Sequence, residues 1–224
     1  HCAGSGTARL GNKENYKKNY LPTRSIVKFC KKKKKKPTII FMSSYSIYGF
    51  IKSSSAKEND LPMPISSYAK TKKLCEDLLL KHNKSNKINI KILRLSSIYG
   101  NGIKKQIFFD ACKKISQKQS TFFGTGNEIR DWLHISDLCD FISKILRNPK
   151  NRYKIINCGY GKGYKVKHVI KQIKKNLKSN LKIKFIKQKT TEPKKLLINI
   201  NLAKSFNWRP KINLNKGIKK YTNW

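Results

Sequence analysis

The 224-residue sequence is poor in acidic side chains and poor in arginine. Only 11 Asp and Glu stand against 52 Lys and Arg, which gives a formal net charge of +41. Such a charge favours attraction to polyanions at low salt. However, only seven of the basic residues are Arg, the side chain that recognises phosphate and guanine through paired hydrogen bonds. Because the excess is lysine spread along the whole chain, we predict no specific nucleic-acid partner.

Long apolar runs and paired cysteines are also missing. The sequence has no run of 18 apolar residues and no charged-then-apolar leader, so we predict neither membrane insertion nor export. The six cysteines include no C-x-x-C pair and lie at positions 2, 30, 75, 112, 139 and 158. This spacing predicts neither a metal site nor a disulfide framework, and it favours the reducing cytoplasm. Hydrophobic residues still make up 38% of the chain, enough for one sizeable core.

Helical and strand periodicities alternate in the first half of the chain. We expect a helix at about 15–30, a buried strand at 38–42, a helix at about 66–82 and a second strand at 88–95. A serine N-caps the second helix, whose Leu74, Leu78 and Leu79 we expect to face inward. Strands separated by helices predict a parallel sheet with helices on both faces, the doubly wound α/β class.

The second half of the chain is less regular. We expect helices at about 103–118, 136–147 and 165–178, and short strands at 121–123 and 153–157. This pattern predicts a smaller lobe joined to the sheet. Residues 1–98 would form the sheet domain, and residues 99–224 would be mainly the lobe, with segments that return to the sheet. The lysine run at 31–36 lies between a helix and a strand, and we interpret it as a solvated loop.

Three side chains with complementary chemistry come together in this pattern. Ser44 follows the first strand, and Tyr68 and Lys72 stand four residues apart near the start of the next helix. Positions i and i+4 share a helical face, which we expect to point toward the carboxyl end of the strand, where open parallel sheets bind ligands. A phenol titrates at about 10, and a nearby ammonium favours its phenolate. The group therefore predicts acid/base chemistry assisted by a serine hydroxyl.

The S-x-x-x-Y-G stretch at 44–49 and the Y-x-x-x-K pair resemble the extended short-chain dehydrogenase/reductase superfamily, in particular the NAD-dependent epimerase/dehydratase family, which acts on nucleotide sugars. Further segments are similar to that family's motifs in the same order: HCAG at 1–4, Asn19 with Thr23, RLSSIYGNG at 94–102, FGTGNEIRDWLHISD at 123–137, NCGYG at 157–161 and FNWRP at 206–210. The resemblance extends over essentially the whole chain. It implies a Rossmann-like sheet with a C-terminal substrate-binding lobe.

The resemblance implies catalytic roles. Tyr68 would be the acid/base, Lys72 would bind the nicotinamide ribose and lower the pKa of Tyr68, and Ser44 would polarise the substrate hydroxyl or carbonyl. Arg130 would grip the substrate diphosphate, a task that suits a forked guanidinium.

The resemblance also implies binding residues. Ala3 and Gly4, in a turn under the adenine side, and Asn19 would contact the cofactor together with Tyr68 and Lys72. Two further substrate contacts depart from the family's motifs, because Ser97 stands in place of Asn and Lys189 in place of an Arg found in many members. Asn101 likewise replaces a Pro.

Simpler structural roles stay open for several of these residues. Ser44 could have no role beyond ending a strand, and Arg130 could have no role beyond pairing with Asp131 or Asp137. We interpret His134 as structural. We assign Tyr45, Tyr48 and Tyr99 to packing or to the lining of the cleft.

Two parts of the family's pattern do not occur in the sequence: the glycine-rich phosphate turn G-x-x-G-x-x-G after a first strand, and the ribose-reading residue of a second strand. At about 30 residues per βαβ unit, two such units imply about 60 residues in front of His1. We expect NAD as the cofactor, and NADP stays open because the ribose reader is not present.

The resemblance favours one reaction over its relatives. Dehydratases of this family usually carry Asp-Glu after the catalytic residue, whereas Tyr45 and Ser46 follow Ser44 here. We therefore favour an NAD-dependent epimerase that transiently oxidises C4 of a nucleoside-diphosphate sugar for surface-polysaccharide synthesis. A ketosugar reductase using NAD(P)H, a dehydratase, an inactive fragment and a non-specific polyanion binder stay open. The resemblance also implies a homodimer through the helices at 15–30 and 66–82.

Overall fold

The computed structural model describes residues 1–5, 10–51, 53–83, 88–147, 154–188 and 192–224. Its first half contains α1 (Asn12–Asn15), the π-helical turn η1 (Tyr16–Tyr20), α2 (Leu21–Lys31), β1 (Thr38–Ser44), the 3-10 turn η2 (Tyr45–Tyr48), α3 (Ser67–Asn83), β2 (Asn89–Leu95) and β3 (Ser97–Tyr99). Its second half contains α4 (Gln106–Ser116), β4 (Thr121–Phe123), β5 (Ile129–His134), α5 (Ile135–Arg147), β6 (Ile155–Cys158), β7 (Gly163–Lys165), α6 (Val166–Asn176), β8 (Lys184–Ile186), β9 (Lys195–Leu196), α7 (Asn201–Lys204) and α8 (Leu214–Thr222).

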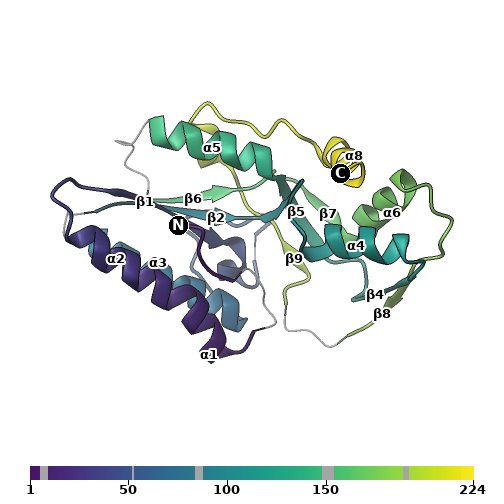
Figure 1. Ribbon diagram of the computed structural model, residues 1–224, viewed down its shortest axis with the longest axis horizontal. Helices are drawn as coiled ribbons and strands as arrows, with labels where there is room; N and C mark the ends of the chain where they lie inside the picture. The colour runs from purple at the N-terminus through teal and green to yellow at the C-terminus, as the bar shows by residue number, and fades with distance from the viewer. Residues whose placement is uncertain (6–9, 52, 84–87, 148–153, 189–191) are drawn as a thin grey trace.

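A parallel sheet organises the first part of the molecule. Its strands lie in the order β1-β2-β6, and both neighbouring pairs are parallel. Helices α2 and α3 cover one face and α5 covers the other (Figure 1). Ile90, Ile92 and Leu93 of β2 are completely buried, as expected for a strand covered on both faces. The predicted α/β fold is confirmed.

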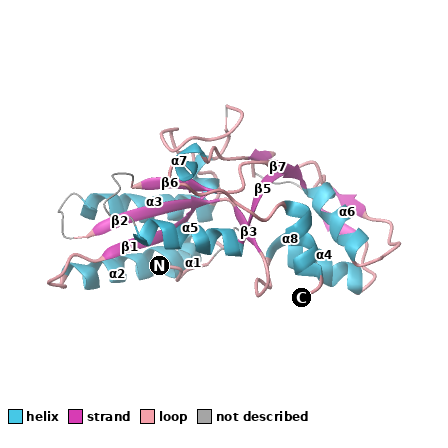
Figure 2. Cartoon of the chain, turned by 90° about the horizontal axis from the view of Figure 1, so that it is seen from above, coloured by secondary structure: helices cyan, strands magenta, loops and turns pink. Residues whose placement is uncertain are grey.

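Strand β5 connects the elements of the second part. It pairs in parallel with β3 and β9 and antiparallel with β7, while β4 pairs separately with β8. Helices α4, α6 and α8 lie together at the end of the molecule away from α2 and α3 (Figures 1 and 2). Only β4 and β6 were predicted in this part. Strands β3, β7, β8 and β9 have only two or three residues and carry too little periodicity to be recognised. Strand β5 has six residues, but its polar and apolar residues do not alternate. The division into domains at residue 98 stays a prediction.

The predicted helices are present, with ends shifted by a few residues. The helix expected at 15–30 begins earlier and passes through the π-helical turn η1. In α3 the serine cap is confirmed, since Ser66 Oγ accepts a hydrogen bond from the amide of Ala69 at 3.2 Å. The prediction that Leu74 faces inward was wrong, because 49% of it is exposed, while Leu79 is fully buried. The buried stripe of α3 instead contains Lys72 and Glu76.

A buried ion pair joins α3 to the sheet. Arg94 of β2 donates to both carboxylate oxygens of Glu76, at 3.1 Å from Nε and 2.8 Å from Nη2. The hydroxyl of Ser43 on β1 donates to the same carboxylate at 2.6 Å. The two charged side chains are only 3% and 1% exposed. Because buried charges are tolerated only when paired and hydrogen-bonded, this pair holds α3 in one position against β1 and β2.

A second buried carboxylate orders the turn after β6. Asp131 is fully buried, and its oxygens accept hydrogen bonds from the backbone amides of Tyr160 and Gly161, both at 2.8 Å. Burial raises the pKa of Asp131 to about 6, because desolvation of the carboxylate outweighs the two amides that favour its charged form. The fold is therefore sensitive to the protonation of this side chain.

The surface carries most of the positive charge. The lysines at 31–36 are all exposed, in and after the last turn of α2, which confirms that this run is a solvated connection. Among the residues that the structure describes, no helix combines the length and the apolar character needed to cross a membrane.

Removing one partner of the buried ion pair should destabilise the protein strongly. We expect Glu76→Ala to lower the free energy of unfolding by about 3–5 kcal/mol, because it leaves Arg94 buried and unpaired. Asp77→Ala is the matched control, since its partner Lys73 lies one turn away on the exposed side of α3 and such a pair contributes about 0.5 kcal/mol. Denaturation in guanidinium chloride measures both changes, and equal values would contradict the role of the buried pair.

The raised pKa of Asp131 predicts a pH dependence of stability. A carboxyl whose pKa is higher in the folded state stabilises the fold when protonated, so its contribution is complete below its ordinary pKa of 3.8 and is lost as the pH rises through about 6. We expect the free energy of unfolding to fall by up to about 3 kcal/mol across this window. Asp131→Asn should flatten the slope whatever its effect on absolute stability. Parallel slopes for the two proteins between pH 4 and 6 would refute this assignment.

Candidate active site

Ser44 lies at the carboxyl end of β1, where the chain turns into η2. It is only 8% exposed, and its Oγ accepts a hydrogen bond from the amide of Ser46 at 3.2 Å and lies 2.9 Å from the hydroxyl of that residue. Its side chain is also close enough to Tyr68 to lower the pKa of that phenol by hydrogen bonding. Ser44 therefore ends the strand and also presents its hydroxyl to the phenol.

Tyr68 and Lys72 lie on the first turns of α3, facing the end of β1. The Lys72 ammonium is buried, donates to the carbonyl of Met42 at 2.8 Å and lies 4.8 Å from the centre of the Phe41 ring. It lies 5.8 Å from the centre of the Tyr68 ring. The structure thus brings together Ser44, Tyr68 and Lys72, as the sequence predicted.

The protonation of this group differs from the expectation. Burial raises the pKa of Tyr68 to about 12, and the hydrogen bond from Ser44 offsets only part of this effect. Burial also lowers the pKa of Lys72. In this structure the Lys72 ammonium is directed at the Met42 carbonyl, and it is not among the groups that shift the pKa of Tyr68. The expected lowering of the Tyr68 pKa by Lys72 stays a prediction. Tyr68 is a neutral phenol near neutral pH.

The N-terminal turn borders these residues. The amino group of His1 donates to the carbonyl of Ile40 on β1 at 2.8 Å. Gly4 has a φ of +145°, and a Cβ there would lie 2.6 Å from Asn19 Oδ1, so the turn tolerates no side chain at this position. Asn19 is 1% exposed and accepts from the amide of Ser5 at 3.2 Å. The predicted cofactor residues Gly4 and Asn19 therefore lie together, and the neighbouring Ala3 is exposed.

Arg130 lies on β5 and is held by three acceptors. Its Nη1 donates to the carbonyls of Ile129 at 2.9 Å and Lys194 at 3.3 Å. Its Nη2 lies 3.5 Å from a carboxylate oxygen of Glu192. Since 47% of the Glu192 side chain is exposed, this carboxylate is a weak and replaceable partner.

The simpler pairing considered for Arg130 was wrong. Asp131 accepts its hydrogen bonds from the turn after β6, and Asp137 accepts from the backbone amides of Lys211 and Ile212 at 3.0 Å each. Neighbouring residues of a strand point to opposite faces, so Asp131 faces away from Arg130. Arg130 keeps donor groups that an anionic ligand can use.

Three aromatic residues have the structural roles predicted for them. Tyr48 donates to Asn157 Oδ1 at 2.7 Å, and Tyr99 stacks on Phe108 with ring centres 4.1 Å apart. His134 is 4% exposed and accepts a backbone hydrogen bond at Nδ1. None of these three lies among the groups that face Tyr68.

Tyr45 and Ser97 make a contact that sequence reasoning missed. The phenol oxygen of Tyr45 lies 2.8 Å from Ser97 Oγ, which joins η2 to β3. No spacing in the sequence links these two positions. The third predicted substrate residue, Lys189, lies outside the described residues.

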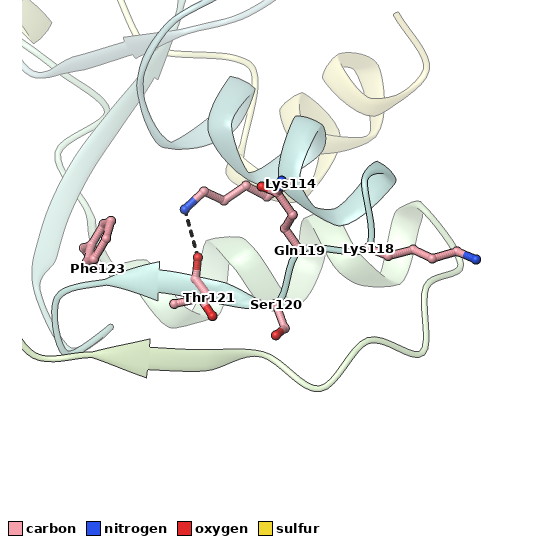
Figure 3. Close-up of a pocket in the computed structure, with 6 residues that line it drawn as sticks. All are labelled: Lys114, Lys118, Gln119, Ser120, Thr121 and Phe123. Carbon is pink, nitrogen blue, oxygen red and sulfur yellow. Dashed lines mark hydrogen bonds between the residues drawn. The ribbon is translucent and has the colours of Figure 1, made fainter.

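A hollow of about 370 Å³ lies between α4 and β4. Figure 3 shows Lys114 reaching across it from α4 to the carbonyl of Thr121, a hydrogen bond of 2.8 Å. The ammonium lies 5.4 Å from the ring centre of Phe123, which is 64% exposed. Phe123 directly precedes the loop with Gly124 and Gly126 that leads to Arg130, so one residue that lines the hollow adjoins that loop in the sequence. The sequence had given no reason to single out Lys114.

The chain is similar to known proteins over nearly its whole length. The profile of the NAD dependent epimerase/dehydratase family matches residues 1–159. A putative UDP-glucose 4-epimerase of Methanocaldococcus jannaschii is 28% identical over 213 residues, which cover 92% of this chain and 68% of that protein. The ADP-L-glycero-D-manno-heptose-6-epimerase of Brachyspira hyodysenteriae is 30% identical over 168 residues, 71% of this chain and 52% of that protein. The chain therefore spans about two thirds of the length of the first relative and about half of the length of the second.

Solved structures share the fold. The UDP-glucuronic acid 4-epimerase of Bacillus cereus, in complex with UDP-glucuronic acid and NAD, matches with a TM-score of 0.90 at 26% identity, over 100% of this chain and 73% of that one. The dTDP-glucose 4,6-dehydratase of Bacillus anthracis matches with a TM-score of 0.84 at 22% identity, over 96% of this chain and 70% of that one. With the family profile matched over more than half of its residues, and with Ser44, Tyr68 and Lys72 gathered at the end of β1, the chain belongs to the NAD-dependent epimerase/dehydratase family.

Proposed function

We propose that the protein is a nucleotide-sugar epimerase that inverts C4 of a nucleoside-diphosphate sugar with NAD as cofactor. The observation that carries the proposal is the convergence of Ser44, Tyr68 and Lys72 at the carboxyl end of β1. Relatives support it, since those similar to the chain include UDP-glucose, UDP-glucuronate and UDP-arabinose 4-epimerases. A role in surface-polysaccharide synthesis stays a prediction.

The residues present fit one part of the dinucleotide. Lys72 offers a buried ammonium beside Tyr68. Gly4 and Asn19 form a turn in which Gly4 has no space for a side chain. These residues would hold the nicotinamide ribose and the adenine side. The sequence contains no glycine-rich turn for the pyrophosphate. Bound there, NAD would supply the hydride chemistry at the sugar carbon.

Tyr68 and Ser44 handle the proton of the sugar hydroxyl. Tyr68 removes that proton at its phenol oxygen and later gives it back, while Ser44 holds the sugar oxygen in line by hydrogen bonding. With a pKa of about 12, Tyr68 holds its own proton in the structure. Proton removal therefore requires positive charge near the phenol, and Lys72 supplies it when the ammonium turns from the Met42 carbonyl toward Tyr68.

Arg130 and Ser97 bind the substrate diphosphate in this proposal. A diphosphate oxygen replaces the exposed carboxylate of Glu192 at Arg130 Nη2, because the diphosphate bridge carries two negative charges and its oxygens suit the forked guanidinium. The exposed ring of Phe123 beside the hollow at Lys114 offers a surface on which a nucleobase stacks.

Two other features bear on the proposal. Dehydration is disfavoured because the side chains after Ser44 are hydroxyls, with Tyr45 bound to Ser97 and Ser46 bound to Ser44. A homodimer through α2 and α3 is supported by apolar side chains on their outer surface, since Phe29 and Leu74 are 60% and 49% exposed.

The proposal is tested by incubating the protein with UDP-glucose, UDP-glucuronic acid or UDP-arabinose and catalytic NAD. We expect the C4 epimer to appear in the proton NMR spectrum without net formation of NADH. Consumption of one NADH or NADPH per turnover would indicate a reductase, and loss of water would indicate a dehydratase. A protein that neither converts nor binds any of these sugars would contradict the proposal.

Tyr68→Phe should separate chemistry from binding. We expect turnover to fall by about 10³-fold, because the acid/base group is lost, while the affinity for the nucleotide sugar measured by calorimetry stays within about threefold. Tyr16→Phe is the matched control, since Tyr16 lies on η1 and is 41% exposed. A Tyr68→Phe protein with unchanged turnover would exclude Tyr68 as the acid/base.

Arg130→Lys should weaken binding of the diphosphate. We expect the dissociation constant for the nucleotide sugar to rise about tenfold, since an ammonium cannot make paired hydrogen bonds to a phosphate. Arg209→Lys is the matched control because Arg209 is exposed and bonds only to backbone carbonyls in the described residues. Equal affinities of the Arg130 and Arg209 variants would show that Arg130 does not bind the diphosphate.

A further inference from the structure

Tyr45 links the catalytic serine to the strand that faces Arg130. It directly follows Ser44 and is 6% exposed, with its ring in the same hydrophobic cluster as Leu93 and Leu133. Its phenol oxygen emerges from that cluster 2.8 Å from Ser97 Oγ. Packing explains the position of the ring, but it does not explain why a polar group is placed against a half-buried serine.

The register of the strands places Ser97 beside Arg130. Ser97 pairs with Trp132 in the parallel contact of β3 with β5. Paired residues of neighbouring strands point to the same face, and so do residues two apart on one strand. Arg130 therefore shares the face of Ser97, while Asp131 points to the opposite one. Arg130 also acts electrostatically on the Tyr45 phenol, as does Glu192.

The direction of the hydrogen bond follows from the chemistry of the two hydroxyls. Burial raises the pKa of Tyr45 to about 12, against the opposing effect of Arg130, so the phenol keeps its proton. The geometry allows either hydroxyl to donate, and the arrangement in which Tyr45 donates and Ser97 Oγ accepts is favoured because a phenol is a stronger hydrogen-bond donor than an aliphatic alcohol. The proton of Ser97 is then available for another acceptor, and the bond from Tyr45 polarises it.

We propose that Tyr45 is a positioning residue for the substrate: it donates to Ser97 Oγ and thereby aims the Ser97 hydroxyl at a phosphate oxygen of the nucleoside diphosphate that Arg130 binds. This inference rests on the proposed function and adds to it a residue outside the Ser44, Tyr68 and Lys72 group. It also gives the short Ser97 side chain a fixed direction, which a free serine rotor lacks.

A double-mutant cycle in the full chain tests the inference. Calorimetric titration with UDP-glucuronic acid gives the affinity of the unmodified protein, Tyr45→Phe, Ser97→Ala and the double variant. We expect each single variant to bind about tenfold more weakly, as for the loss of one hydrogen bond to a charged group. The double variant should bind no more weakly than Ser97→Ala alone, because Tyr45 acts through Ser97.

Tyr48→Phe is the matched control. It makes the same chemical change in the same 3-10 turn and removes a buried hydrogen bond of 2.7 Å to Asn157. Its affinity should stay within about twofold even where guanidinium unfolding detects a loss of stability. Circular dichroism identifies any variant that fails to fold, and Tyr45→Leu or Ser97→Gly, which also remove the hydroxyl, then replaces it in the cycle.

Each outcome decides the inference. Coupled losses at Tyr45 and Ser97, with Tyr48→Phe unaffected, support it. Unchanged affinity of Tyr45→Phe, or effects of Tyr45→Phe and Ser97→Ala that add, overturns it while the proposed function stands. Failure of the unmodified protein to bind UDP-glucuronic acid, UDP-glucose and UDP-arabinose overturns both.

Discussion

The buried pair of Arg94 and Glu76 is the constraint on which the site depends. Glu76 lies one helical turn after Lys72, which itself lies one turn after Tyr68, so a single stripe of α3 carries all three side chains. Fixing Glu76 against β1 and β2 therefore fixes the rotation of α3 about its axis. A rotation that moved Tyr68 away from Ser44 would leave two buried charges unpaired, and that cost exceeds most single packing gains.

Buried polar side chains also fix the position of segments in the second half of the chain, where strands are short. Asp131 holds the turn after β6, and Asp137 holds the segment before α8. Asn157 bonds to the carbonyls of Ala56 and Asn199 and to the Tyr48 hydroxyl. Each of these groups replaces hydrogen bonds that a longer strand would have made. Three of the 11 acidic residues, Glu76, Asp131 and Asp137, are buried and make these structural hydrogen bonds.

The predictable part of the fold is the part with long periodic segments. The strands β1 and β2 and the helix α3 were recognised because each contains enough residues to reveal its period. The short strands β3, β7, β8 and β9 and the six-residue strand β5 were missed, since their pairing is decided by neighbours distant in the chain. Leu74 was misplaced for a related reason: the stripe of α3 that faces the sheet is selected by Glu76 and its partner, not by the leucines alone.

The family, the sheet class and the chemical identity of Ser44, Tyr68, Lys72 and Arg130 could be predicted before the structure was known, because motif order and helical spacing are local properties. The protonation of Tyr68, the pairing of Arg130 with Glu192 and the contact of Tyr45 with Ser97 became visible only in the folded chain. Desolvation and hydrogen-bond partners depend on what surrounds a group in space, and residues from 52 to 62 positions apart in the chain make these contacts.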